Sequence, residues 1–173
     1  RYVETRFPQT AAEAQAFKEK LCARFVNDAS RMRDDMKPLA LDTSSAFRGV
    51  VGSIEEQVEK ADRAATGEEE SRYSQITLAD MRANLEGGQK TYEAFAPWLL
   101  TTANGKDLDA RIRAGFARLQ SAYDAISGDA LPPVPSTWSS QNPSAADQAT
   151  PFGVLFMRIK VEADPKTAGS LVS

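Results

Sequence analysis

The 173-residue sequence contains no histidine and a single cysteine, and these two shortages exclude several kinds of site. Without an imidazole, the chain alone cannot build a Ser-His or Cys-His nucleophile pair, an HExxH zinc site or a histidine general base. Cys22 has no second cysteine to pair with, so an intramolecular disulfide is excluded. Catalysis would therefore need carboxylates, Tyr or Lys, or a histidine from another chain.

The sequence also lacks long apolar runs and an excess of positive charge. No apolar run approaches the about 18 residues that a transmembrane helix needs, so no membrane span is expected. Lys and Arg number 21 against 24 Asp and Glu, which gives a net charge of −3. A chain without a basic stripe is a poor candidate for binding nucleic acid or an anionic membrane surface. With 42% hydrophobic and 26% charged residues, the composition is that of a globular domain.

Apolar residues recur at helical spacing along most of the chain. This periodicity predicts four long helices, over about 10–37, 43–66, 77–99 and 107–127, and a shorter fifth that begins near Ser144 or at Thr150 and closes at Asp164. Thr10 with Glu13 and Thr77 with Asp80 form capping patterns at the starts of the first and third helices, and Asp107 is the expected cap of the fourth. Between the fourth and fifth, residues 129–150 form a Pro- and Ser-rich loop. We predict an all-α fold over residues 1–173: an antiparallel four-helix bundle with an additional shorter C-terminal helix after the Pro-rich loop. The aromatic residues on apolar stripes are expected in its core: Phe17, Phe25, Phe47, Phe95, Phe116, Tyr123 and Phe156.

The segment between the second and third helices carries most of the functional information. Three glutamates, 68–70, precede Arg72 and Tyr73, and Asp80 and Asn84 then lie one turn apart on one helix face. An acidic solvated loop followed by a helix cap would account for the charges. A polar stripe beside the small residues 87–88 also fits a buried polar cluster or a pocket wall. The candidate binding residues are Glu69, Arg72, Tyr73, Ser74, Asp80 and Asn84.

This segment resembles the C-terminal half of the imelysin-like proteins. The run from Glu68 to Asn84 reads Glu-Glu-x-Ser-Arg-Tyr-Ser-x-x-Thr-Leu-x-Asp-x-x-x-Asn and is followed by Leu-Glu-Gly and, a little later, by Tyr92. The stretch from Asp107 to Ile126 is similar to the helix that follows in that family, which includes EfeO-type iron-uptake proteins and the so-called M75 peptidases. Gln75 stands where some EfeO-type relatives carry histidine, which favours the imelysin-like branch.

The resemblance implies an all-helical, two-bundle protein of the bacterial cell envelope, periplasmic or associated with the outer membrane, and linked to metal uptake. It also implies a metal site centred on a His-x-x-Glu motif in the N-terminal half, whereas this chain has no histidine. We therefore expect the chain to be the C-terminal half of a longer protein. Its partner would be the N-terminal bundle of the same protein or a separate chain. The bound cation would be iron or another divalent or trivalent metal, with the ligands in this chain unknown.

Three functions follow from these observations. In the first, the chain is a binding module that forms one wall of a metal-site cleft. In the second, it belongs to a metallopeptidase of the M75 type, with Glu69 or Asp80 orienting a metal-bound water. In the third, it is a non-catalytic interaction module that has lost the metal site and docks a partner through Trp138 and the Pro-rich loop. The residues give the peptidase hypothesis no support of their own, so binding is favoured over catalysis.

Overall fold

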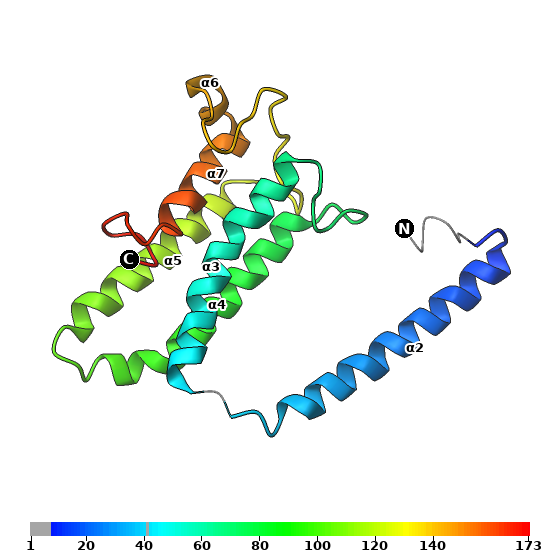
Figure 1. Cartoon of the computed structure of the whole chain (residues 1–173), viewed down its shortest axis with the longest axis horizontal. Coiled ribbons are helices and arrows are strands. Elements are labelled where there is room, and N and C mark those ends of the chain that lie inside the picture. The colour runs from blue at the N-terminus through cyan, green and yellow to red at the C-terminus, as the bar shows by residue number, and fades with distance from the viewer. Residues whose placement is uncertain (1–7, 41) are drawn as a thin grey trace. The chain divides into compact units, whose positions relative to one another are not determined.

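A computed structural model describes residues 8–40 and 42–173, and over these residues the chain is helical without any strand (Figure 1). This confirms the predicted all-α class. The chain divides into two compact units, one ending at Asp42 and one running from Thr43 to Ser173. The helices are α2 (Ala11–Met36), α3 (Thr43–Ala65), α4 (Thr77–Leu99), α5 (Gly105–Asp124), α6 (Ala145–Gln148) and α7 (Pro151–Glu162).

The second unit is a bundle of four packed helices with the short α6 attached. Helix α3 packs against α4 and α7, α5 packs against α4 and α7, and α6 packs against α7. Each long helix contributes an apolar stripe to one core, as its 3.6-residue periodicity dictates. The largest fully buried apolar side chains are Tyr92, Tyr123, Phe152, Ile54, Leu78, Met81, Leu85, Leu119, Leu155 and Ile159.

The Pro-rich connection is an ordered part of this bundle. The Trp138 ring lies edge-on to Phe152 and Phe156, with ring centroids 4.9 and 5.0 Å apart. Both predicted helix starts are present, because Ser144 caps α6 and Thr150 caps α7 with a proline in the first turn. The Trp138 ring therefore packs against aromatic residues of its own chain. The hypothesis that it docks a partner rested on a large aromatic side chain in a loop, and this packing accounts for that side chain without a partner.

Two predicted helix caps are wrong. Thr77 was expected to open the third helix with a capping pattern, but the N-cap of α4 is Ile76 and no side chain caps it. Asp107 lies in the first turn of α5, whose N-cap is Asn104. The reason at α4 is a competing contact, since the carboxylate of Asp80 accepts a hydrogen bond from Ser71 instead of reaching back to the helix start.

Helix α2 makes up most of the first unit, and none of its residues, all of which the structure describes, is buried. Its start is as predicted, with Thr10 and Glu13 forming a reciprocal capping box. The expectation that Phe17 and Phe25 lie in the core is wrong, because these side chains are 42% and 72% exposed. An apolar stripe shows that a helix has a face to bury, but it does not identify what buries it.

No helix in the described part of the chain is both long and apolar enough to cross a lipid bilayer.

Candidate functional site at the junction of α3 and α4

The connection from Thr66 to Ile76 reverses the chain between two antiparallel helices. Gly67 follows α3 with a φ of 75°, the left-handed conformation that glycine adopts without steric cost. Gln75, close to the start of α4, has a φ of 55°, and its backbone N–H donates to the carbonyl of Ser71 at 2.7 Å. This hydrogen bond closes a compact turn that presents residues 68–74 at one end of the bundle.

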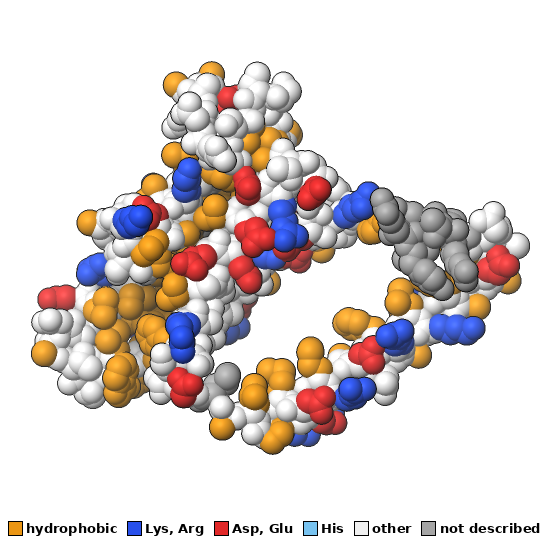
Figure 2. Space-filling model, in the orientation of Figure 1, with side chains coloured by type: hydrophobic (Ala, Val, Ile, Leu, Met, Phe, Trp, Pro, Cys, Tyr) orange, Lys and Arg blue, Asp and Glu red, His pale blue; other side chains and the backbone are white. Residues whose placement is uncertain are grey.

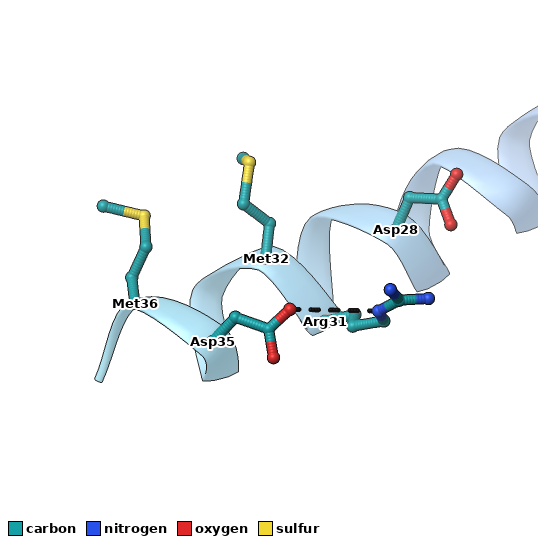
Figure 3. A pocket seen from close by; sticks show the side chains of 5 residues that line it. All are labelled: Asp28, Arg31, Met32, Asp35 and Met36. Carbon is teal, nitrogen blue, oxygen red and sulfur yellow. Dashed lines mark ion pairs between the residues drawn. The ribbon is translucent and has the colours of Figure 1, made fainter. Parts of the chain in front are cut away.

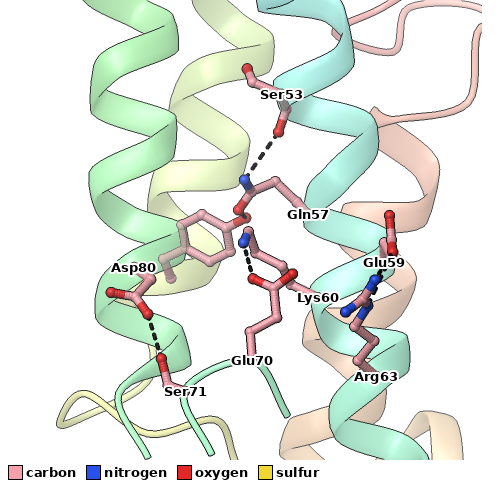
Figure 4. A network of polar contacts seen from close by, with 9 residues as sticks. Ser53, Gln57, Glu59, Lys60, Arg63, Glu70, Ser71 and Asp80 are labelled. Atoms are coloured by element: carbon pink, nitrogen blue, oxygen red, sulfur yellow. Dashed lines mark hydrogen bonds and ion pairs between the residues drawn. The ribbon is translucent and has the colours of Figure 1, made fainter. Parts of the chain in front are cut away.

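Two side-chain contacts tie this turn to the helices on either side (Figure 4). Lys60 of α3 forms an ion pair with Glu70. Ser71 donates a hydrogen bond of 2.5 Å to a carboxylate oxygen of Asp80 on α4. A charge-assisted hydrogen bond of this kind is stronger than one between neutral groups. Two adjacent residues of the turn, Glu70 and Ser71, are therefore anchored to α3 and α4.

Two polar atoms in this junction have no hydrogen-bond partner among the described residues. They are the Oε1 atom of Glu69 and the hydroxyl oxygen of Thr77, and both atoms are buried. Thr77 as a residue is only 1% exposed. Because an unsatisfied buried polar group costs about 1–3 kcal/mol, and a charged one more, native proteins contain few of them. The unpaired carboxylate oxygen of Glu69 is therefore the most unusual feature of the junction.

The other predicted site residues line the same segment without converging on one point. Tyr73 is 77% exposed, and the guanidinium of Arg72 lies 5.9 Å from the centre of its ring. Ser74 is exposed, and Asn84 is half-buried one turn along α4 from Asp80. Across residues 8–40 and 42–173, no group of three or more His, Cys, Asp or Glu side chains is placed to hold a metal ion. The predicted site residues therefore do not form a coordination shell within the described part of the chain.

Below the junction, a buried polar pair fixes α3 against α5. The hydroxyl of Tyr123 donates to Oε1 of Gln57 at 3.0 Å, and the amide nitrogen of Gln57 donates to the carbonyl of Ser53 at 3.0 Å. Tyr123 and Gln57 are both fully buried. Burial raises the pKa of Tyr123 well above its ordinary value of 10.0, so the phenol remains a neutral donor.

Sequence reasoning missed the residues that position the acidic segment. Lys60 lies on the charged face of α3 and Ser71 lies in the turn, and only the folded turn brings them to Glu70 and Asp80. Arg82 was also missed. Its guanidinium donates three hydrogen bonds of 2.6–2.8 Å to backbone carbonyls at the C-terminal end of α5 and just beyond it. In the sequence, the only indication of this contact was that Arg82 is the single arginine of α4 and lies beside its apolar stripe.

Comparison with known proteins gives two matches. The family model described as imelysin, of the M75 peptidase group, matches residues 4–150. A protein of Staphylococcus haemolyticus named as an Efem/EfeO family lipoprotein is 35% identical over 102 residues, which cover 56% of this chain and 34% of the relative. The match thus spans about a third of the length of that curated relative. No solved structure matches the chain.

Proposed function

The chain belongs to the imelysin family, and from this premise we propose that it takes part in iron uptake at the bacterial cell envelope. In this proposal iron is the cargo. The segment from Glu69 to Asn84 forms one wall of the cleft that holds it, and the opposite wall carries the His-x-x-Glu motif that this chain lacks. That wall belongs to the N-terminal bundle of the same protein or to a partner chain, and the assembly lies in the periplasm or at the outer membrane.

The observation that carries this proposal is the buried, unpaired Oε1 atom of Glu69. A carboxylate oxygen shielded from water gains most from a ligand that carries positive charge. Among the nearby cations, Lys60 is paired with Glu70 and Arg63 with Glu59. A metal ion brought by the opposite wall would supply the missing positive charge.

The chemistry of the neighbouring donors agrees with a hard cation. Glu69, Glu70 and Asp80 offer carboxylate oxygens, which suit cations such as Fe³⁺, Ca²⁺ and Mg²⁺ better than soft metals that prefer sulfur. Ser71 and Lys60 hold Asp80 and Glu70 in place. We assign these two carboxylates to orienting the segment and Glu69 to direct contact with the cation.

The exposed edge of the turn provides the contact between the two walls. Tyr73 presents a large aromatic ring to solvent, and Arg72 packs beside it. Aromatic and arginine side chains are the residue types most enriched at binding hot spots. Ser74 and Asn84 add neutral polar groups that can hydrogen-bond across the cleft. In this arrangement Arg72, Tyr73, Ser74 and Asn84 recognise the opposite wall.

Iron titration of the complete gene product, compared with the isolated 173-residue chain, tests the proposal. The complete product is expected to bind Fe³⁺ stoichiometrically, and the isolated chain is expected to bind it only weakly. Glu69→Gln, which keeps the shape and removes the charge, should weaken binding at least about 10-fold, the equivalent of 1.4 kcal/mol. Glu68→Gln is the matched control because Glu68 is adjacent and exposed, and it should stay within about twofold of the parent.

Two outcomes would contradict the proposal. Tight stoichiometric binding by the isolated chain would show that no second wall is needed. Equal affinity of the Glu69→Gln and Glu68→Gln proteins would show that Glu69 does not contact the cation. The peptidase alternative predicts a different result, in which the complete product cleaves an unstructured protein substrate and Glu69→Gln abolishes that cleavage while folding is unchanged.

A further inference from the structure

Helices α5 and α7 border a groove that combines apolar surface with two arginines. All of its residues belong to the unit from Thr43 to Ser173, so its geometry is defined within one unit. Figure 2 shows Lys and Arg side chains beside hydrophobic ones over these two helices. The groove has a volume of about 410 Å³, which lies within the range of roughly 300–1,000 Å³ typical of small-molecule sites. It is lined by Ala117, Arg118, Ser121 and Ala122 from α5 and by Val154 and Arg158 from α7.

The two arginines of this groove share one carboxylate. Two nitrogens of the Arg118 guanidinium donate to the two oxygens of Glu162 at 2.5 and 2.8 Å. A terminal nitrogen of Arg158 lies 3.6 Å from the Oε1 atom of Glu162, which is beyond hydrogen-bonding distance. The Glu162 side chain is only 1% exposed. Two guanidinium groups and one carboxylate therefore leave a net positive charge at the end of the groove.

The carboxylate of Glu162 is fixed on the side of Arg118. Its Oε2 atom accepts a hydrogen bond of 3.0 Å from the backbone N–H of Leu171. The guanidinium of Arg118 also donates to the backbone carbonyl of Gly169 at 2.8 Å, so the tail after α7 holds both partners in place. Turning Glu162 toward Arg158 would break these hydrogen bonds. Arg158 is therefore the surplus cation of the groove.

An arginine with a carboxylate of its own offers no such surplus charge. In the pocket near the end of α2, Arg31 forms an ion pair with Asp35 at 3.8 Å, close to Met32 and Met36 (Figure 3). The arginine charge of that pocket is balanced by a neighbour one turn away. Arg158, by contrast, has no carboxylate of its own among the described residues, because its one ion pair there is with the carboxylate that already binds another arginine.

The lining of the groove indicates which class of molecule would balance this charge. One surplus positive charge matches a monoanion, whereas a phosphate group carries about −1.5 to −2 near neutral pH. The planar guanidinium is matched in geometry to a carboxylate. Val154 is 59% exposed, and with Ala117 and Ala122 it offers apolar surface that a short alkyl chain would cover. The groove therefore fits an organic acid with a charged head and an aliphatic body.

We propose that this groove is a binding site for small aliphatic carboxylic acids, with the carboxylate on Arg158 and the alkyl chain across Ala117, Ala122 and Val154. Arg118 and Glu162 position the charged end of the site. The site is built from α5 and α7 rather than from the junction of α3 and α4, and its ligand is independent of the proposed iron cargo.

Ligand-observed saturation-transfer NMR on the complete gene product, with sodium hexanoate as the probe, tests this assignment. Hexanoate is expected to bind with a Kd below about 1 mM, an affinity within reach of a ligand of this size. Acetate lacks most of the alkyl chain and hexanol lacks the charge. Each should bind at least about 10-fold more weakly than hexanoate, because each makes only one of the two kinds of contact.

Three variants locate the binding site. Arg158→Gln removes the surplus charge and should weaken hexanoate binding at least about 10-fold. Lys160→Gln is the matched control, because it removes the same charge from the same helix at a position that does not line the groove, and it should stay within about twofold of the parent. Val154→Thr keeps the shape and replaces a methyl group by a hydroxyl, so it should weaken binding about fourfold. Tryptophan fluorescence verifies that each variant is folded.

Four outcomes would overturn the assignment. Equal hexanoate affinity of the Arg158→Gln and Lys160→Gln proteins would show that Arg158 does not bind the carboxylate. Hexanol binding as tightly as hexanoate would reduce the groove to an apolar patch, and acetate binding as tightly would reduce it to a simple anion contact. No saturation up to about 10 mM hexanoate would show that the site does not form. Iron affinity of the Arg158→Gln protein should equal that of the parent, so the failure of this proposal is distinguishable from failure of the proposed function.

Discussion

The buried pair formed by Tyr123 and Gln57 allows a quantitative test of how the bundle that carries the junction is held together. Tyr123→Phe removes one hydroxyl group and leaves the Oε1 atom of Gln57 buried without its donor, which was 3.0 Å away. The cost of an unsatisfied buried acceptor is about 1–3 kcal/mol. Gln57→Leu leaves the phenol without its acceptor and also removes the hydrogen bond to Ser53, so its cost falls in the same range.

The double variant, Gln57→Leu with Tyr123→Phe, should be much less unstable than the sum of the two single variants. Removing both partners leaves no orphaned polar atom, and replacing a hydrogen-bonded pair by apolar groups of similar shape is often nearly neutral. We expect the double variant to lose at least about 1 kcal/mol less than that sum, the usual sign of direct coupling between neighbours.

Urea unfolding followed by tryptophan fluorescence measures these differences in the bundle alone. Both tryptophans, Trp98 and Trp138, belong to the unit from Thr43 to Ser173, so the signal is not influenced by melting of α2. Midpoints at an unchanged slope convert directly into differences in unfolding free energy. A loss below about 0.5 kcal/mol for Tyr123→Phe, or strictly additive losses in the double variant, would refute the reasoning.

Three further predictions concern other polar contacts of the bundle. Arg82→Met removes three hydrogen bonds from the end of α5 and should lower the unfolding free energy by about 2–3 kcal/mol in the same urea assay. Burial raises the pKa of Tyr123, and burial with the Asp109 carboxylate raises that of Tyr92. Their contribution is complete below pH 10 and is lost as the pH rises further, so unfolding should accompany the phenolate absorbance change. Hydrogen bonds from Thr137 and Ser144 lower the pKa of Asp147 below 3.8. Its stabilising contribution is therefore present above that pH, and the difference in thermal midpoint between parent and Asp147→Asn should shrink as the pH falls below it.

The sequence predicted the helices better than it predicted what covers them. The helix from Thr43 to Ala65 and the one from Thr77 to Leu99 agree closely with the expected ranges, because apolar periodicity and local breakers define a helix within its own segment. Phe17 lies on an equally clear stripe and is still 42% exposed. A side chain is buried only when a second element packs on it, and the periodicity of one segment does not identify that second element.

The candidate site shows the same division between local and tertiary information. Glu69 was identified from its acidic run, and Asp80 and Asn84 from their helical spacing. Sequence patterns could not show that Ser71 holds Asp80 and that Lys60 holds Glu70, since those contacts depend on a turn closed by a backbone hydrogen bond. Nor could they show that Glu69 is the carboxylate left with an unpaired oxygen.

The most direct test of the proposed metal site is to locate the iron itself. Crystals of the complete gene product soaked with Fe³⁺ and measured at the iron absorption edge would show the ion as an anomalous difference peak. The proposed function predicts that peak within coordination distance of Oε1 of Glu69, with the remaining ligands contributed by the His-x-x-Glu motif. A peak bound only by the histidine-bearing bundle, remote from Glu69, would contradict it.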